Sequence, residues 1–223
     1  MDNSHSFDRG LGLYNPAIVA GKPITIVGCG GIGSYLALSL VKLGVNTLHL
    51  IDNDEVEDVN LGGQIYGIRD VGRPKVEALA EHIRRLSPQR VNITTQHERV
   101  ATVDTCYALF SAVDSMETRS ALYGSALAGA EHFFDGRIGG DYIRAYAVEI
   151  GRQSERKQYA STLYSDDEAS PLPCTEQNVA YLGFTIAGML TRLFAASSAG
   201  LPRPWEILHH APSFHSLPSI LTE

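Results

Sequence analysis

Short apolar runs alternate along this chain with longer segments whose apolar positions recur every three or four residues. The runs predict strands, and the spaced positions predict amphipathic helices. The expected strands are residues 23–27, 47–51, 91–95, 107–113, 132–134 and 142–150. The expected helices are residues 34–43, 74–86, 115–130 and 176–198. Strands that alternate with helices predict an α/β fold with a mainly parallel sheet and flanking helices, and we expect an antiparallel extension in the C-terminal half.

The same pattern divides the chain into a main domain and peripheral segments. Residues 1–22 are expected to form an irregular or helical N-terminal arm, and residues 23–200 the main domain. Within this domain the polar stretch 151–175 is expected to be an exposed crossover. The proline-rich residues 201–223 predict an extended C-terminal tail.

A glycine-rich turn, Gly-Cys-Gly-Gly-Ile-Gly over residues 28–33, joins the first strand to the first helix. Glycine is required where a turn is tight and where backbone N–H groups approach a phosphate. The second strand ends at Asp52, where a carboxylate can accept hydrogen bonds from ribose hydroxyls. This β–α–β arrangement predicts a Rossmann-like nucleotide-binding domain. The glycines expected to bind the nucleotide are Gly28, Gly30, Gly31 and Gly33.

Charge and composition exclude other classes of protein. The formal net charge of −7 and the pI near 5.6 argue against a nucleic-acid-binding surface, which needs clustered Lys and Arg. The sequence has no run of about 18 apolar residues, so no membrane span is expected. Cys29, Cys106 and Cys174 lack the spacing of a zinc site or a disulfide framework, which favours a reducing cytoplasm.

A second group of candidate residues follows the glycine turn. Asn60 and Gln64 carry neutral amides suited to phosphate oxygens, and Lys75 is a mobile point charge suited to a triphosphate. Asp114 follows the fourth expected strand and is a candidate ligand of Mg²⁺, which binds through one carboxylate together with phosphates. Asp54, in the loop after the second strand, is a further nucleotide-binding candidate.

Each of these residues also has a simpler interpretation. Lys75 taken alone is typical of a solvated helix lysine, and Asp114 is equally typical of an N-cap of the helix that follows it. Asp54 is part of an acidic loop that is expected to be solvated. The occurrence of all these residues together favours the nucleotide site.

Three motifs carry a resemblance to a known family. They are Asp-x-Asp-x-Val-x-x-x-Asn-Leu-x-x-Gln over residues 52–64, Val-Gly-x-Pro-Lys-Val over residues 71–76, and Asp-x-x-x-Thr-Arg over residues 114–119. With these motifs the chain resembles the ubiquitin-activating-enzyme superfamily, whose bacterial members are the ThiF, MoeB and HesA proteins.

The resemblance implies an adenylyltransferase that uses Mg²⁺ and ATP. In such enzymes the C-terminal glycine carboxylate of a small ubiquitin-like or sulfur-carrier protein attacks the α-phosphorus of ATP, pyrophosphate leaves, and an acyl-adenylate forms. The resemblance gives Asp52 to the ribose, Asp114 to the magnesium, and the phosphates to Asn60, Gln64 and Lys75. It also implies a homodimer or a pseudo-symmetric heterodimer.

One residue of the family pattern is missing. The family usually has an arginine directly before the glutamine of the first motif, and Gly63 occupies that position here. The loss of one such phosphate-binding donor costs on the order of 3 kcal/mol of barrier. The candidate substitutes are Arg69, the catalytic candidate Arg137, and Arg9 acting from the N-terminal arm of a second protomer.

Cys174 lies in the segment Pro-Leu-Pro-Cys-Thr-Glu over residues 171–176. In activating enzymes a Pro-x-Cys-Thr segment at this place carries the cysteine that receives the modifier as a thioester, so the resemblance implies a catalytic role for Cys174. The alternative is that its side chain packs under the last helix as a small apolar residue.

Two other functions remain open at this stage. The glycine turn and Asp52 are equally typical of an NAD-dependent oxidoreductase, although no later residue is an evident acid or base for hydride transfer. The glycine at position 63 is also compatible with a non-catalytic scaffold, the inactive half of an activating heterodimer.

Overall fold

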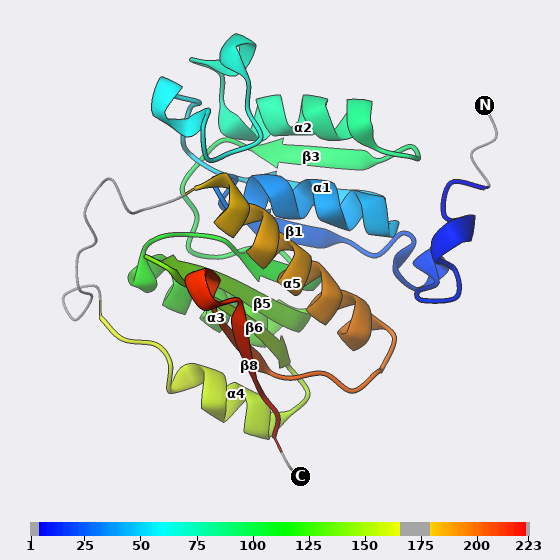
Figure 1. The fold of residues 1–223 in the computed structure, drawn as a ribbon, viewed down its shortest axis with the longest axis vertical. Coiled ribbons are helices and arrows are strands. Elements are labelled where there is room, and N and C mark those ends of the chain that lie inside the picture. The colour runs from blue at the N-terminus through cyan, green and yellow to red at the C-terminus, as the bar shows by residue number, and fades with distance from the viewer. Residues whose placement is uncertain (1–4, 166–178, 222–223) are drawn as a thin grey trace.

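The structure of the protein, a computed structural model, describes residues 5–165 and 179–221. These residues form one eight-stranded sheet with helices on both faces (Figure 1). The strand order is β3-β2-β1-β4-β5-β6-β7-β8. The pairs from β3 to β5 are parallel and the pairs from β5 to β8 are antiparallel. The predicted fold, a mainly parallel sheet with an antiparallel extension in the C-terminal half, is confirmed.

The described elements have the following bounds. The strands are β1 (Ile24–Val27), β2 (Thr47–Ile51), β3 (Asn92–Gln96), β4 (Cys106–Ser111), β5 (Ala130–Gly139), β6 (Tyr142–Glu149), β7 (Glu206–His210) and β8 (His215–Ser219). The α-helices are α1 (Gly33–Leu43), α2 (Lys75–Leu86), α3 (Met116–Gly129), α4 (Gln153–Ala160) and α5 (Ala180–Ser198). The 3-10 helices are η1 (Asp8–Gly10), η2 (Pro16–Val19), η3 (Asp58–Asn60), η4 (Ile68–Asp70) and η7 (Ala211–Ser213).

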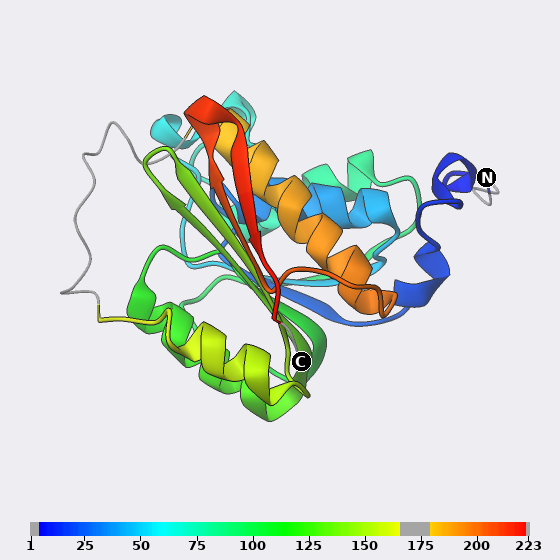
Figure 2. The ribbon, with the colours of Figure 1, turned by 60° about the horizontal axis from the view of Figure 1, so that its bottom comes forward.

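Two layers of helices enclose the sheet. Helices α1, α2 and α5 cover one face, and α3 and α4 cover the other (Figure 2). Because successive side chains of a strand point to opposite faces, neighbouring residues belong to different cores. Phe110 and Phe134 stack at 4.7 Å and contact Phe194 of α5, whereas Leu109 and Phe133 pack toward α3. The sheet is therefore rigidly held from both sides.

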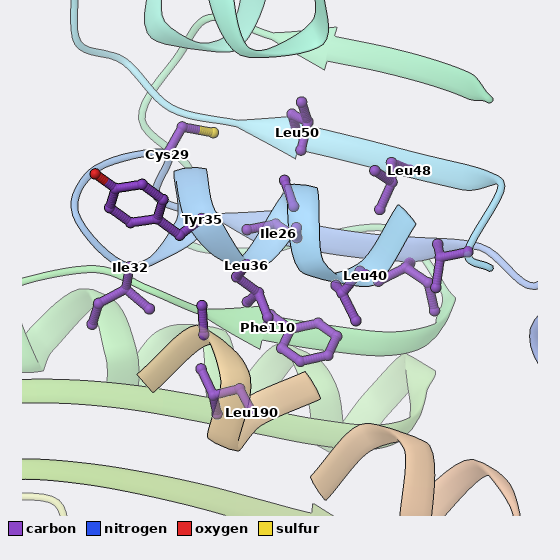
Figure 3. Close-up of a cluster of buried hydrophobic side chains, with 14 of the residues drawn as sticks. Ile26, Cys29, Ile32, Tyr35, Leu36, Leu40, Leu48, Leu50, Phe110 and Leu190 are labelled. Carbon is purple, nitrogen blue, oxygen red and sulfur yellow. The ribbon is translucent and has the colours of Figure 1, made fainter. Parts of the chain in front are cut away.

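The first β–α–β unit is buried along its length. Leu36 and Leu40 of α1 lie between Ile26 of β1 and Phe110 of β4 on one side and α5 on the other (Figure 3). All four side chains are 0% exposed, and burial of each leucine contributes about 2 kcal/mol. Helix α1 ends at Gly44, whose φ of +119° is the left-handed conformation that glycine adopts without strain. This packing fixes the N-terminal turn of α1.

The stretch after β6 differs from its expectation as an exposed crossover. Its first part forms α4, and Glu155 and Tyr159 of this helix are buried. Glu155 pairs with Arg203 at 2.8 Å, and both side chains are less than a tenth exposed. Hydrophobic periodicity does not predict this helix, because a polar pair rather than an apolar face lies on one of its buried sides. The remainder of the expected crossover, including Cys174, lies outside the described residues.

The proline-rich tail is extended, but two of its segments are strands of the main sheet. Strand β7 pairs with β6, and β8 pairs with β7. Pro218 lies in β8, at the edge of the sheet, where the missing N–H does not interrupt a ladder.

Helix α5 has the length and apolar composition of a membrane span, and among the described residues it alone does. Ile186, Leu190 and Phe194 of this helix are nonetheless buried against α1 and the sheet. This packing is that of a core helix.

Candidate nucleotide site

The glycine turn lies where the order of the parallel strands reverses. Strand β1 pairs with β2 on one side and with β4 on the other, and all three run parallel. The chain proceeds outward from β1 to β3 and then returns to β4. At such a reversal, ligands bind outside the carboxyl ends of the strands. Gly28, Asp52 and Asp114 follow β1, β2 and β4, so the fold brings these three predicted residues to one edge.

Two glycines are required by the packing of the turn itself. Gly28 has a φ of +91°, and a Cβ there would lie 2.4 Å from the carbonyl oxygen of Ala112. A Cβ on Gly33 would lie 1.8 Å from the carbonyl oxygen of Gly28. Gly30 differs, because within 4 Å its Cβ would meet only Nε2 of Gln64, at 3.8 Å. The backbone at Gly30 is therefore free of clashes and open to a ligand, as a phosphate-binding turn must be.

Gly31 contacts the helix layer above the turn. A Cβ added to Gly183 of α5 would lie 2.4 Å from the carbonyl oxygen of Gly31. Helix α5 therefore approaches the turn closely because residue 183 has no side chain. Tyr35 of α1 and Phe184 of α5 complete this contact, with ring centroids 4.1 Å apart.

The Gln64 side chain lies beside the turn with an unpartnered polar atom. Its Oε1 is buried and has no hydrogen-bond partner within the described parts of the chain. Such an atom costs about 1–3 kcal/mol when it is left unsatisfied, and as an amide oxygen it suits an N–H or O–H donor of a ligand, while Nε2 of the same amide can donate to phosphate oxygens. The Asn60 side chain, unlike the Gln64 oxygen, has a protein partner: its Oδ1 accepts the Glu57 N–H at 2.9 Å and caps η3.

Asp52 connects the glycine turn to the tip of β2. Its Oδ2 accepts the Cys29 N–H at 2.6 Å, and its Oδ1 accepts the Asp54 N–H at 2.8 Å. Burial raises the pKa of Asp52, and these two N–H groups and the Lys75 charge partly offset that rise. A carboxylate oxygen accepts more than one hydrogen bond, so Asp52 retains capacity for ribose hydroxyls.

Lys75 is buried, and its interpretation as a solvated helix lysine is wrong. Its Nζ donates to Oδ2 of Asp54 at 2.8 Å, and the lysine and aspartate side chains are 8% and 56% exposed. The Tyr66 hydroxyl donates to the carbonyl oxygen of Cys29 at 2.6 Å and to that of Lys75 at 3.3 Å. Burial raises the pKa of Tyr66, so the hydroxyl remains a donor. The glycine turn, Lys75 and Asp54 thus form one connected unit.

Asp114 is exposed in the turn between β4 and α3. Its alternative role as an N-cap is wrong, because the Ser115 hydroxyl accepts the Thr118 N–H at 3.2 Å and caps α3. The part of the chain that the structure describes holds no group of three or more His, Cys, Asp or Glu side chains that forms a complete metal site. A single carboxylate beside a phosphate-binding turn does fit Mg²⁺, which takes its other ligands from phosphates and water.

Arg137 has protein partners. Its Nε donates to Asp135 at 2.7 Å, and its Nη1 and Nη2 donate to the Thr162 carbonyl and hydroxyl at 3.0 Å. The Asp135 carboxylate raises the pKa of Arg137 against the effect of burial. This pairing places Arg137 in a structural network, and its expected phosphate contact stays a prediction.

The other candidate arginines and the cysteines lie as follows. Arg69 is exposed in η4, in the loop before α2. Arg9 lies in η1, at the end of the sheet opposite to the glycine turn (Figure 1). Arg9 therefore cannot complete the site of its own chain, and its role in a second protomer stays a prediction. Cys29 and Cys106 are buried, and burial raises the pKa of both thiols.

Sequence reasoning missed the pair formed by Arg119 and Asp135, which are 3% and 0% exposed and 2.7 Å apart. Two signals for it were present. Arg119 ends the third motif, and Asp135 directly follows two phenylalanines of a buried strand. A charged residue within a buried strand implies a charged partner.

A comparison of the sequence with models of known protein families assigns the chain to a family. A sequence model described as the ThiF family matches residues 20–200. The chain belongs to the ThiF family. The resemblance inferred from the three motifs is thereby confirmed.

The curated relatives of this chain are named for different activities. The tRNA threonylcarbamoyladenosine dehydratase of Escherichia coli (strain K12) is 36% identical over 113 residues, which are 47% of this chain and 42% of that protein. The ATP-dependent ubiquitin transferase-like protein Cap2 of Pseudomonas aeruginosa is 36% identical over 41% of this chain and 18% of that protein. The adenylyltransferase and sulfurtransferase uba4 of Aspergillus niger is 38% identical over 35% of this chain and 16% of that protein. The matches span less than half the length of each relative.

Solved structures share the fold. Escherichia coli MccB, solved with AMPCPP and MccA, has a TM-score of 0.78 at 17% identity over 99% of this chain and 73% of that chain. PaaA has a TM-score of 0.75 at 19% identity over 93% of this chain and 66% of that chain.

Proposed function

We propose that this ThiF-family protein is an ATP-dependent adenylyltransferase that activates the C-terminal glycine of a small ubiquitin-like or sulfur-carrier protein. One observation carries the proposal. The open backbone at Gly30 faces the amide nitrogen Nε2 of Gln64, a donor for phosphate oxygens, and the turn is connected to a buried lysine at the reversal point of a parallel sheet. The adenylyltransferase activity in the name of uba4, and the AMPCPP and MccA in the MccB structure, support the proposal by analogy.

The chain's own residues divide the reaction between them. Asp52 accepts hydrogen bonds from the ribose, the N–H groups of the glycine turn beyond Cys29 donate to phosphate oxygens, and Lys75 adds a positive charge that favours the charged transition state. A carboxylate oxygen of the carrier forms a bond to the α-phosphorus, the bond from that phosphorus to the bridging oxygen breaks, and pyrophosphate leaves with the electron pair. Asp114 would hold Mg²⁺, which neutralises phosphate charge when bound.

The proposal also includes a homodimer in which Arg9 enters the partner's site during adenylation, and transfer of the activated carrier to Cys174 afterwards. The E. coli tRNA threonylcarbamoyladenosine dehydratase suggests a second substrate class, linked to tRNA. The net charge of −7 and pI near 5.6 disfavour it for this chain, because tRNA binding calls for clustered basic residues.

ATP–pyrophosphate exchange tests the proposal. The purified protein is assayed with Mg²⁺, ATP and small proteins that end in Gly-Gly and are encoded beside it. We expect exchange that requires the carrier's last glycine and falls about a hundredfold in Lys75→Ala. Lys42→Ala, an exposed lysine of α1, is the control and should retain full exchange. ATP binding without exchange for any carrier would instead support the non-catalytic scaffold.

A further inference from the structure

The motif that contains Asp114 ends in Arg119, a residue that the proposed function leaves without a role. Arg119 belongs to α3 and is 3% exposed. Its Nε donates to Oδ1 of Asp135 at 2.7 Å, and its Nη2 donates to the carbonyl oxygen of Val113. The planar guanidinium makes both bonds at once, which a lysine ammonium cannot reproduce. Arg119 therefore connects a buried acid to the residue directly before Asp114.

The Val113 carbonyl lies where β4 leaves the sheet. The last step of the β1–β4 ladder is the bond from the Ala112 N–H to the Val27 carbonyl, at 2.8 Å. A Cβ on Gly28 would lie 3.2 Å from the Val113 nitrogen, so this turn packs directly on the glycine turn. The arginine thus binds a backbone segment that forms one side of the candidate site.

Asp135 fixes the orientation of the Arg119 guanidinium. It lies on β5, is 0% exposed, and accepts hydrogen bonds from Arg119, from Arg137 at 2.7 Å and from the Tyr159 hydroxyl at 3.0 Å. A buried carboxylate with this many partners has one stable arrangement. The position of the Arg119 fork is fixed accordingly.

We propose that Arg119 is a positioning residue that holds Asp114 beside the glycine turn through the Val113 carbonyl, and that Asp135 orients Arg119 for this purpose. The inference rests on the proposed function, because the place of Asp114 matters for ligand binding only if Mg²⁺ and ATP occupy this edge. Arg119 acts through the backbone and touches no ligand.

Arg119→Lys tests the inference, with Arg203→Lys as a matched control. The Arg203 side chain is only 7% exposed, pairs with a buried carboxylate at 2.8 Å and donates to a backbone carbonyl, that of Ala147, at 3.1 Å. These two partners belong to α4 and β6, and β6 is the third strand from β1 in the sheet order. The two substitutions therefore lower the melting temperature by similar amounts, but only Arg119→Lys removes a support of Asp114.

Two measurements separate positioning from stability. Hydrogen exchange of the nucleotide-free protein should be about tenfold faster over residues 112–118 in Arg119→Lys than in wild type or Arg203→Lys. In calorimetry, the Mg²⁺ concentration that gives half of the metal's effect on ATP binding should rise about tenfold in Arg119→Lys, with ATP binding in EDTA unchanged. If Arg119→Lys does not fold, Asp135→Asn, which keeps the shape of that side chain, should show the same two changes.

Wild-type values for both measurements in the Arg119 variant, or equal changes in the Arg203 control, would overturn the inference. A wild-type protein that binds no ATP would overturn the proposed function instead. The exchange comparison would then still decide whether Arg119 holds the turn.

Discussion

The ammonium of Lys75 lies 2.8 Å from the carboxylate of Asp54, and only the aspartate is substantially exposed. The pair joins the first turn of α2 to the loop after β2. A second bond supports it, from the Lys75 N–H to the Asp54 carbonyl at 2.9 Å. The positive charge is therefore held at the carboxyl edge of the sheet by an acid on its solvent side.

Replacing Asp54 with Asn tests this arrangement. We expect the free energy of unfolding to fall by about 1 kcal/mol, because the hydrogen bond from Lys75 loses its charge assistance. The loss is no larger because Asp54 is exposed and solvent screens its attraction to Lys75. ATP binding should weaken about fivefold, since Lys75 is no longer held in place. Glu55→Gln removes one negative charge from the same exposed loop and is the control. Denaturant unfolding and calorimetry measure the two effects, and equal results for the two variants would contradict the role of Asp54.

The glycines of the turn should separate folding from binding. Gly33→Ala forces a carbon into the Gly28 carbonyl, so we expect a loss of about 3 kcal/mol or more of stability. Gly30→Ala meets no atom closer than 3.8 Å, so its melting temperature should stay near that of wild type. Its ATP affinity should nonetheless fall about tenfold or more, because the methyl group occupies the path of the phosphate. Gly62→Ala, with no atom within 4 Å, should leave both quantities unchanged.

If Gly30→Ala binds ATP as well as Gly62→Ala does, the phosphate does not approach the turn at Gly30. That result would remove the turn from the site while leaving the fold intact.

His132 should make the protein sensitive to mild acid. Burial, assisted by the Arg203 charge, lowers the pKa of His132 from 6.5 to about 4 in the folded protein. The unfolded chain binds the proton first as the pH falls, so stability is full above about pH 6.5 and is lost toward pH 4. The loss amounts to about 3 kcal/mol over this window. His132→Phe, which keeps an aromatic ring beside Tyr107, should flatten the pH dependence between these limits.

Denaturant unfolding at several pH values measures this effect. An unchanged slope in His132→Phe would show that other groups cause the acid sensitivity.

The local patterns of the sequence sufficed for the parallel half of the fold and for the gathering of the candidate residues at one edge of the sheet. The glycine turn, Asp52 and Asp114 each directly follow or closely follow a buried strand, and parallel topology alone then brings them to one edge. Nothing in a local pattern shows which distant side chain pairs with which. The partner of Lys75 therefore emerged only from the structure, although Asp54 had been named for a different role.

The C-terminal half was harder to predict for a physical reason. Helix α4 buries Glu155 through the guanidinium of Arg203, so its buried side is not apolar. Strand β8 contains Pro218, which normally argues against a strand and is compatible with one only at the edge of a sheet. Both elements depend on tertiary contacts that hydrophobic periodicity does not record.

A crystal structure of the protein with Mg²⁺ and a non-hydrolysable ATP analogue tests the central claim most directly. The account predicts phosphates over the Gly30 backbone, the Gln64 amide and Lys75 within hydrogen-bond distance of phosphate oxygens, and the metal on the Asp114 carboxylate. An analogue bound away from the carboxyl edge of β1 and β4, or bound there with Lys75 and Asp114 turned away from it, would contradict the account.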